Sequence, residues 1–239
     1  MSSNKNIVLI MGPPASGKSI SLRNLQYQEK KVYLNTDLKE LPFKDSFAKN
    51  VEISDAMDVL GYIAEVEKAD SIDGVVLDTI TFLMSMYERQ YVITSVDTQK
   101  AWGSYGNFYR DFIHAIKSGT KDYVIMAHET SELNETTSIM ENKVPVKGAV
   151  GRTGVEADFT TILQSKRVML RELEGFENDL LTITPEEEED GFKYVFQTRV
   201  DKKSLGAKMR SALGLWSRKE KFIDNDIDLV FKRLHEYYS

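Results

Sequence analysis

Short apolar segments alternate with helix-like segments through the first half of the chain. Residues 55–68 and 107–117 place apolar side chains at helical spacing, which predicts an amphipathic helix in each. Four mostly apolar runs are each long enough for a buried strand: NIVLIM at 6–11, KVYLN at 31–35, GVVLD at 74–78 and DYVIMA at 122–127. This alternation predicts an α/β fold whose mostly parallel sheet is covered by helices on both faces.

The second half has a different pattern, in which strand-like runs follow one another without long helices between them. FTTIL at 159–163 and KRVML at 166–170 predict added strands, some of them antiparallel. LLTIT at 180–184 and KYVFQTRV at 193–200 are expected to form a hairpin around an acidic turn, PEEEEDG. Residues 227–238 have the spacing of a closing amphipathic helix. With no internal repeat, the chain is expected to form a single domain over residues 1–239.

The segment GPPASGKS at 12–19 follows the first predicted strand and fits the pattern G-x-x-x-x-G-K-[ST] at every fixed position. Its glycines allow the backbone to curl so that successive N–H groups point at phosphate oxygens. A helix over KSISLRNLQ would present its N-terminal end to the same anion. Lys18 is expected to reach the β and γ phosphates of a nucleoside triphosphate. The expected nucleotide-binding residues are Gly12, Pro13, Pro14, Ala15, Ser16, Gly17, Lys18, Ser19 and Ile20.

A magnesium site is expected beside this loop. The Ser19 hydroxyl is one ligand that the motif provides. Asp78 ends the buried run GVVLD and supplies the carboxylate that holds the metal in enzymes of this kind. The same aspartate also stands where it could cap the helix that follows, and the two roles are compatible. The predicted cofactors are therefore ATP and Mg²⁺.

Composition excludes several other kinds of site. The 239-residue chain contains no cysteine, which excludes disulfides and cysteine-based zinc sites, and its three scattered histidines make a poor metal cage. A formal net charge of −6 argues against coating nucleic acid with the whole surface, so DNA binding would be confined to loops. The opening MSSNKN lacks the apolar core of a secretory signal. We therefore expect a cytoplasmic protein with no membrane segment.

Two classes of phosphate-loop enzyme fit poorly. A GTPase requires an Asn-Lys-x-Asp motif after a later strand, whereas the nearest match, NKVP at Asn142, lacks the aspartate. An adenylate-kinase-type enzyme requires arginines clustered in a lid, whereas the arginines here are spread along the chain. The RecA-like class remains.

Four segments carry a resemblance to small phage-encoded RecA-fold nucleotide-binding proteins, which include core-only single-strand-annealing recombinases. They are VYLNTD, VVLDTIT, KAWGSYGNFYRDFIHAI and YVIMAHET. The resemblance implies that Asp37 polarises the attacking water, although this family usually has glutamate there, and Glu40 is the second candidate. It also implies that His128, with Glu129 beside it, senses the γ-phosphate. The alternative role for Asp37 is to cap a turn before Pro42.

The segment 201–216 contains a further candidate pair, Lys208 and Arg210. Ring and filament ATPases of this class present a Lys-x-Lys or Lys-x-Arg pair to the γ-phosphate held by the neighbouring subunit, where the cations stabilise developing charge. The spacing here matches, which implies a homo-oligomer. A solvated basic loop explains the same two residues equally well.

RecA-like recombinases bind single-stranded DNA through two loops, which correspond here to residues 91–105 and 131–152. The first contains Lys100, Trp102 and Tyr105, a cation with aromatic faces that could stack on bases. Packing against the sheet is the alternative role for Trp102. The cations of the second loop are suited to phosphates: Lys143, Lys147 and Arg152.

The combined expectation is a Mg²⁺-dependent ATPase that assembles on single-stranded DNA in phage recombination, annealing or repair. The resemblance adds a single-strand-binding protein as a further partner. Two alternatives remain open. A nucleotide or small-molecule kinase would need a phosphate acceptor, and a non-catalytic ATP-switched binding module would bind ATP without turning it over.

Overall fold

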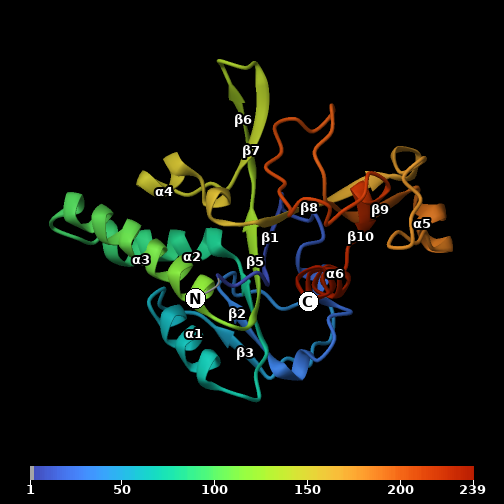
Figure 1. Ribbon diagram of the computed structural model, residues 1–239. Helices are drawn as coiled ribbons and strands as arrows, with labels where there is room; N and C mark the ends of the chain where they lie inside the picture. Colours follow the sequence, from blue (N-terminus) through green and yellow to red (C-terminus); the bar gives the residue numbers. More distant parts are fainter. Residues whose placement is uncertain (1–2) are drawn as a thin grey trace.

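The computed structural model describes residues 3–239, and its centre is an eight-stranded sheet (Figure 1). The strand order is β10-β9-β8-β1-β5-β4-β2-β3. The six strands from β8 to β3 are parallel, whereas β9 and β10 are antiparallel additions at one edge. This confirms the α/β class and the added C-terminal strands. The strands are β1 (Ile7–Gly12), β2 (Lys31–Asn35), β3 (Lys49–Glu52), β4 (Gly74–Asp78), β5 (Asp122–His128), β8 (Thr161–Met169), β9 (Phe192–Gln197) and β10 (Phe222–Asp224).

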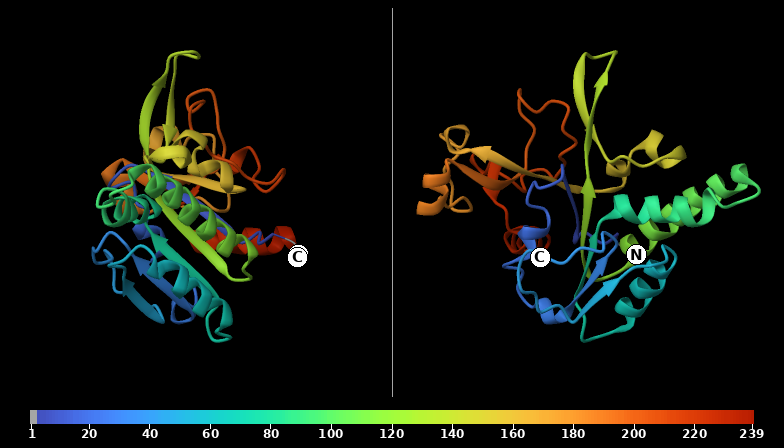
Figure 2. Two further views of the ribbon diagram at one scale, coloured as in Figure 1. Left: turned by 90° about the vertical axis from the view of Figure 1, so that its left-hand side faces the viewer. Right: turned by 180° about the vertical axis from the view of Figure 1, so that it is seen from behind.

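Helices cover both faces of the sheet (Figures 1 and 2). Successive side chains of a strand point to opposite faces, and β1 shows this clearly. Leu9 packs into the core beneath α1, α2 and α3, whereas Val8 and Ile10 pack into the core beneath α6. The helices are α1 (Asp58–Lys68), α2 (Ile80–Tyr87), α3 (Thr98–Ser118), α4 (Gly148–Thr153), α5 (Pro185–Asp190) and α6 (Ile227–Tyr238).

The parallel strands bring polar residues to one edge of the sheet. Gly12 at the end of β1 is in register with His128 at the end of β5, and Asn35 of β2 is in register with Asp78 of β4. Ligands of open α/β sheets bind at this edge, outside the carboxyl ends of the strands. The topology therefore assembles a site from segments far apart in the sequence.

The helix expected after the phosphate loop is largely absent. Only a 3₁₀ helix forms there, over Ser19–Leu22. The next residues are held by the start of α6, because the Asn24 side chain donates to Asp226 Oδ2 at 2.9 Å and the Gln26 backbone N–H donates to Asp228 Oδ1 at 3.2 Å. These contacts across the fold replace the backbone hydrogen bonds that would continue a helix.

The first expected DNA loop, residues 91–105, is mostly helical. Helix α3 begins at Thr98, well before the predicted start at residue 107, and Asp97 caps it by accepting the Lys100 backbone N–H at 3.0 Å. The prediction of a loop there is wrong. The early turns of α3 bury Ala101 and Tyr105 on the same face as the later turns, which extends the apolar stripe.

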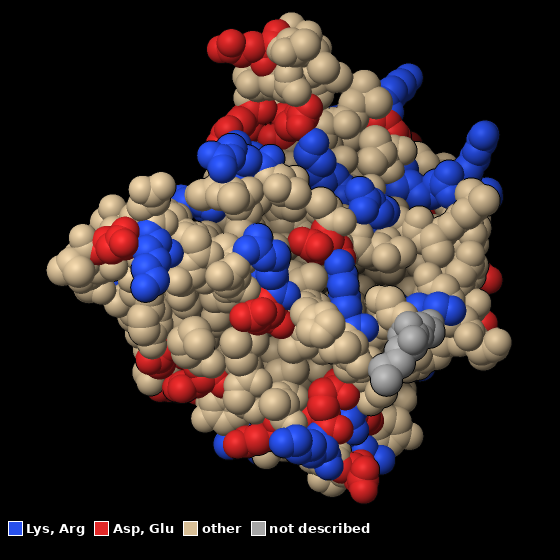
Figure 3. Space-filling model, turned by 60° about the vertical axis from the view of Figure 1, so that its left-hand side comes forward, with Lys and Arg blue, Asp and Glu red and all other residues tan. Residues whose placement is uncertain are grey.

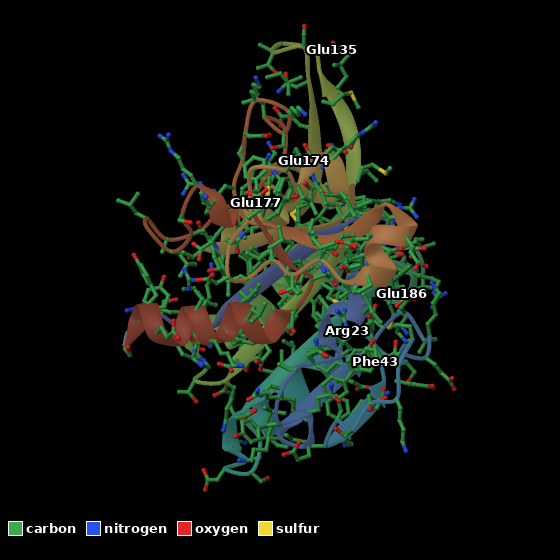
Figure 4. The ribbon with its side chains drawn as sticks, turned by 90° about the vertical axis from the view of Figure 1, so that its right-hand side faces the viewer. Arg23, Phe43, Glu135, Glu174, Glu177 and Glu186 are labelled. Atoms are coloured by element: carbon green, nitrogen blue, oxygen red, sulfur yellow. The ribbon has the colours of Figure 1, made fainter. Side chains whose placement is uncertain are left out.

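The second expected DNA loop, residues 131–152, contains a β-hairpin and a short helix. Strands β6 (Thr130–Asn134) and β7 (Ile139–Lys143) form a separate two-stranded sheet that projects beyond the central one (Figures 1 and 2). Figure 4 places Glu135 at the outer tip of this hairpin, far from Arg23 and Phe43. Most hairpin side chains are exposed, so the sequence has no apolar alternation that would reveal the strands.

The hairpin predicted around residues 185–191 is also wrong. LLTIT forms no strand, and the acidic segment is helix α5 with a capping box between Thr184 and Glu187. Strand β9 instead pairs antiparallel with β10 on one side and with β8 on the other, and β8 merges the two runs expected at 159–163 and 166–170. The closing helix α6 spans the predicted residues 227–238.

Candidate active site

The phosphate loop turns tightly between β1 and the 3₁₀ helix. A Cβ atom on Gly12 would lie 2.4 Å from Ser16 Oγ and 2.6 Å from the Ser165 carbonyl oxygen, so only glycine fits there. Gly17 has φ of +96°, in the region that favours glycine. The Ser165 hydroxyl donates to the Ser16 carbonyl at 2.8 Å and ties the loop to β8. The fixed glycines of the motif are thus explained by backbone geometry.

Lys18 is folded against the loop that carries it. Its Nζ donates to the carbonyl oxygens of Gly12 and Pro13, each at 2.9 Å, and lies 3.4 Å from Nδ1 of His128. The residue is only 6% exposed. Burial lowers the pKa of Lys18 to about 8, although nearby carboxylates, Asp78 first, oppose the shift. The ammonium group is therefore poised at the site with little solvent around it.

The predicted metal ligands are in contact. The Ser19 hydroxyl donates to Asp78 Oδ2 at 2.9 Å, and the same oxygen accepts the Tyr33 hydroxyl at 2.8 Å. Asp78 is 5% exposed and forms no ion pair with any residue in the range 3–239. The helix cap that Asp78 could have provided is made by Thr79, whose side chain accepts the Phe82 backbone N–H. Asp78 therefore does not cap the helix, and its role as a metal ligand stays a prediction.

Asp37 lies in the same pocket and Glu40 does not. Asp37 lines the cavity just after β2, and its carboxylate is 3.1 Å from Nζ of Lys39. Its backbone N–H donates to the carbonyl of Asp78, which fixes the segment to the end of β4. Glu40 is exposed and outside the cavity. Of the two candidate carboxylates, the structure therefore places Asp37, and not Glu40, in the cavity of the phosphate loop.

His128 closes the pocket at the end of β5. Its backbone N–H donates to the Thr81 hydroxyl at 3.0 Å, and the Phe82 ring meets its imidazole edge-to-face at 5.2 Å. Burial first, and then the charge of Lys18, lower the pKa of His128, which favours the neutral ring. Glu129 turns away to accept from Gln164 Nε2 at 2.8 Å, and burial raises its pKa.

Lys18, Ser19, Asp37, Asp78 and His128 all line one cavity of about 440 Å³, which is within the usual range for small-molecule sites. Gly12 and Pro13 contribute carbonyl oxygens to Lys18 but do not line it. Three lining residues carried no sequence signal, because they belong to no motif: Lys39, Pro42 and Tyr194. The cavity is formed by residues 14–20 with Asp37, Lys39, Pro42, Asp78, His128 and Tyr194.

A protein-family model matches most of this chain. A model described as an AAA domain matches residues 4–196. The chain belongs to the AAA domain family. The match includes every residue that lines the nucleotide cavity, so the site described above is that of an AAA-type P-loop ATPase domain.

Among solved structures, a KaiC-like protein from the hyperthermophilic archaeon Pyrococcus horikoshii OT3 is similar to this chain. The two are 12% identical, the TM-score is 0.44, and the alignment covers 84% of this chain and 82% of that one. Comparison with curated proteins finds no match.

The candidate trans-acting pair of this AAA domain lies outside its nucleotide cavity and beyond the matched segment. Lys208 Nζ is 2.5 Å from Glu141 Oε2 on the hairpin. Arg210 forms an isolated antiparallel bridge with Ile162 of β8, and its side chain is exposed. The placement on the surface is compatible with reaching a neighbouring subunit, so the role in trans stays a prediction.

The residues expected to contact DNA are less available than the sequence indicates. Tyr105 is 2% exposed and packs between Tyr87 and Trp102, so the prediction that its ring stacks on bases is wrong. Lys143 lies 2.5 Å from Glu132, and Lys147 lies 2.8 Å from Glu88.

Trp102, in contrast, is partly buried against the core, which was the alternative expected for it. Lys100 and Arg152 are exposed. Within residues 3–239, no helix combines the length and apolar character needed to cross a bilayer.

Proposed function

We propose that this AAA domain is a Mg²⁺-dependent ATP hydrolase. The observation that carries the proposal is the contact between Ser19 Oγ and Asp78 Oδ2, made in the cavity that also holds Lys18. A hydroxyl at the end of the phosphate loop and a buried carboxylate at the end of a neighbouring strand are the two ligands that this chemistry requires. They meet although 59 residues separate them in the sequence.

The residues fit magnesium in particular. Mg²⁺ prefers oxygen ligands and keeps several waters, so one hydroxyl and one carboxylate with substrate phosphates suffice. When bound, Mg²⁺ would bridge the phosphates and offset their negative charge. Ser19 and Asp78 would hold it, while Tyr33 keeps one carboxylate oxygen oriented by its hydrogen bond.

Three other side chains have roles that follow from their positions. Lys18, once released from the carbonyls of Gly12 and Pro13, would place its charge on the β and γ phosphates. Asp37 would orient the attacking water, because it is the carboxylate of the cavity that is not buried. His128, as a neutral ring beside Lys18, would donate to a γ-phosphate oxygen and detect its loss.

We further propose that single-stranded DNA is the partner and that the protein acts in recombination, annealing or repair as an oligomer. The supporting observation is the direct continuation of β5 into the hairpin: His128 ends the strand inside the nucleotide cavity, and β6 begins at Thr130. A change in the contacts of His128 would therefore act on the base of a projecting surface element.

The test is release of phosphate from ATP with Mg²⁺, measured with and without single-stranded DNA. We expect turnover that the DNA increases, and no turnover in Lys18→Ala. Turnover that needs a nucleotide or small-molecule acceptor and ignores DNA would show a kinase instead. Tight ATP binding with no phosphate release under either condition would show a non-catalytic switch.

A further inference from the structure

A second cavity lies between the hairpin and the segment that follows β9. It has a volume of about 450 Å³. One wall is hairpin residues 138–140 and Asn142, and the other is residues 202–207, which rise beside the hairpin in Figures 1 and 2. The two walls are joined by the hydrogen bond from the Asn142 N–H to the Gly206 carbonyl, at 2.9 Å, and by the ion pair of Lys208 with Glu141.

This cavity is lined by cations without acids. Lys166 of β8 is a partly buried lining residue, and Lys202 and Lys203 are exposed ones. Of the carboxylates near it, Glu141 pairs with Lys208 and Asp201 pairs with Lys221. Glu129 forms no ion pair with a cation of the described residues, but it accepts from the lining residue Gln164 at 2.8 Å. Figure 3 shows that Lys and Arg side chains gather in a band across the upper part of one face of the molecule.

The three lysines differ in their exposure and in their hydrogen bonds. The side chains of Lys202 and Lys203 are exposed and form no ion pair with any of residues 3–239. Lys166 is partly buried and donates to Gln197 Oε1 at 2.6 Å, which holds its stem in place. An anion entering the cavity would therefore meet one hydrogen-bonded cation and two exposed ones, without displacing an existing ion pair.

The lining residues point to a phosphate backbone as the ligand. No aromatic side chain is among them, so the cavity offers no surface on which bases would stack. Its volume suits a unit of about one or two nucleotides and excludes a duplex. The cations first expected to bind phosphates, Lys143 and Lys147, are already paired with glutamates. A lysine without an ion-pair partner can neutralise a phosphate, and so release its counterion, without first breaking a salt bridge.

We propose that this cavity binds the phosphodiester backbone of single-stranded DNA through Lys166, Lys202 and Lys203. The inference rests on the proposed DNA-dependent function and assigns its binding site. The DNA strand then lies between the hairpin and the segment after β9, the two elements that Lys208 and Glu141 link.

The test is the salt dependence of binding to a fluorescein-labelled oligo-dT, followed by anisotropy. The variant is Lys202→Ala/Lys203→Ala, and the matched control is Lys68→Ala/Lys219→Ala, which removes two exposed lysines elsewhere. Each lysine that neutralises a phosphate contributes about 0.7 to the slope of log K against log salt for a single strand. We expect the variant to lower the slope by about 1.4 and the control to leave it unchanged.

The possible outcomes separate this inference from the function on which it rests. If the unmodified protein binds no oligo-dT, the proposed DNA function fails and this site with it. If it binds, but the variant and the control have equal slopes, the site is wrong while the DNA function stands. Tighter binding of a duplex than of oligo-dT would also contradict a cavity of this size.

Discussion

The burial of Lys18 disfavours the positive charge that this side chain needs in order to bind a triphosphate. It is 6% exposed, and its pKa is lowered to about 8. A triphosphate is bound best by the protonated amine, and the arriving anion raises the pKa of the lysine. The unliganded protein therefore has to gain a proton on binding ATP whenever the solution pH is above about 8.

We predict that ATP affinity falls as pH rises through about 8. Below this pH the amine is already charged, whereas above it each further pH unit costs about tenfold in affinity until the pKa of the complex is reached. Calorimetric titration across this range, with buffers of different ionisation enthalpy, would show the proton uptake. Lys18→Arg is the control, because arginine stays charged, and the same slope in that variant would contradict the assignment.

Tyr33 is a second residue whose role follows from one contact. Its hydroxyl donates to the Asp78 oxygen that also accepts from Ser19, and burial with the charge of Asp78 raises its pKa. It was not predictable from sequence, because a tyrosine in an apolar strand has the same pattern as a packing residue. Its partner is fixed only by the register of β2 against β4.

We predict that Tyr33→Phe raises the Mg²⁺ concentration for half-maximal turnover about fivefold, as expected for losing a hydrogen bond of about 1 kcal/mol. ATP binding without metal should be unchanged. Tyr123→Phe is the control, because its hydroxyl also donates to a carboxylate, that of Glu67, away from the site. An equal shift in both variants would contradict a positioning role for Tyr33.

At the scale of elements, the buried strands and the closing helix were predictable because their apolar residues follow the pattern of their burial. The elements that were predicted wrongly have different physical causes. The acidic segment after Thr184 is a helix because a capping box and Pro185 at its start outweigh the turn-like composition. Asp226 and Asp228 end the helix after the phosphate loop through contacts distant in sequence. The exposed hairpin has no alternation of apolar and polar residues from which its strands could be predicted.

The contact between the hairpin and the segment after β9 is the element-scale feature most open to test. A Cβ atom on Gly206 would lie 1.8 Å from the Met140 carbonyl oxygen, so Gly206→Ala should separate the two walls. We predict tryptic cleavage in residues 202–208 on the order of tenfold faster, with little change in global melting. Gly103→Ala is the control, because a Cβ there meets nothing within 4 Å. Equal cleavage rates would contradict the docking.

At the scale of the whole molecule, the sheet order sets which residues can act together within one chain. The carboxyl ends of β1, β2, β4 and β5 supply the nucleotide cavity, and these could be anticipated from the motifs. Lys208 and Arg210 lie on the surface outside it. If they complete the site of a neighbouring copy, an isolated chain has only part of the machinery.

We therefore predict that Arg210→Ala lowers turnover on the order of 10³-fold while ATP binding changes little, as for removal of an arginine that stabilises transferred charge. Mixing it with Lys18→Ala should restore part of the activity, because each chain supplies what the other lacks across a shared interface. Mixed oligomers that form without any recovery would assign both residues to a surface loop.

The most direct measurement for the proposed hydrolase compares ATP binding and Mg²⁺-dependent phosphate release in Asp78→Asn. Replacing the buried carboxylate by an amide removes the charge that holds the metal but keeps a hydrogen-bond acceptor for Ser19 and Tyr33. We expect retained ATP binding and a loss of turnover on the order of 100-fold or more, with no change in Asp70→Asn, an exposed control. Unchanged rate and magnesium dependence in folded Asp78→Asn would contradict this expectation.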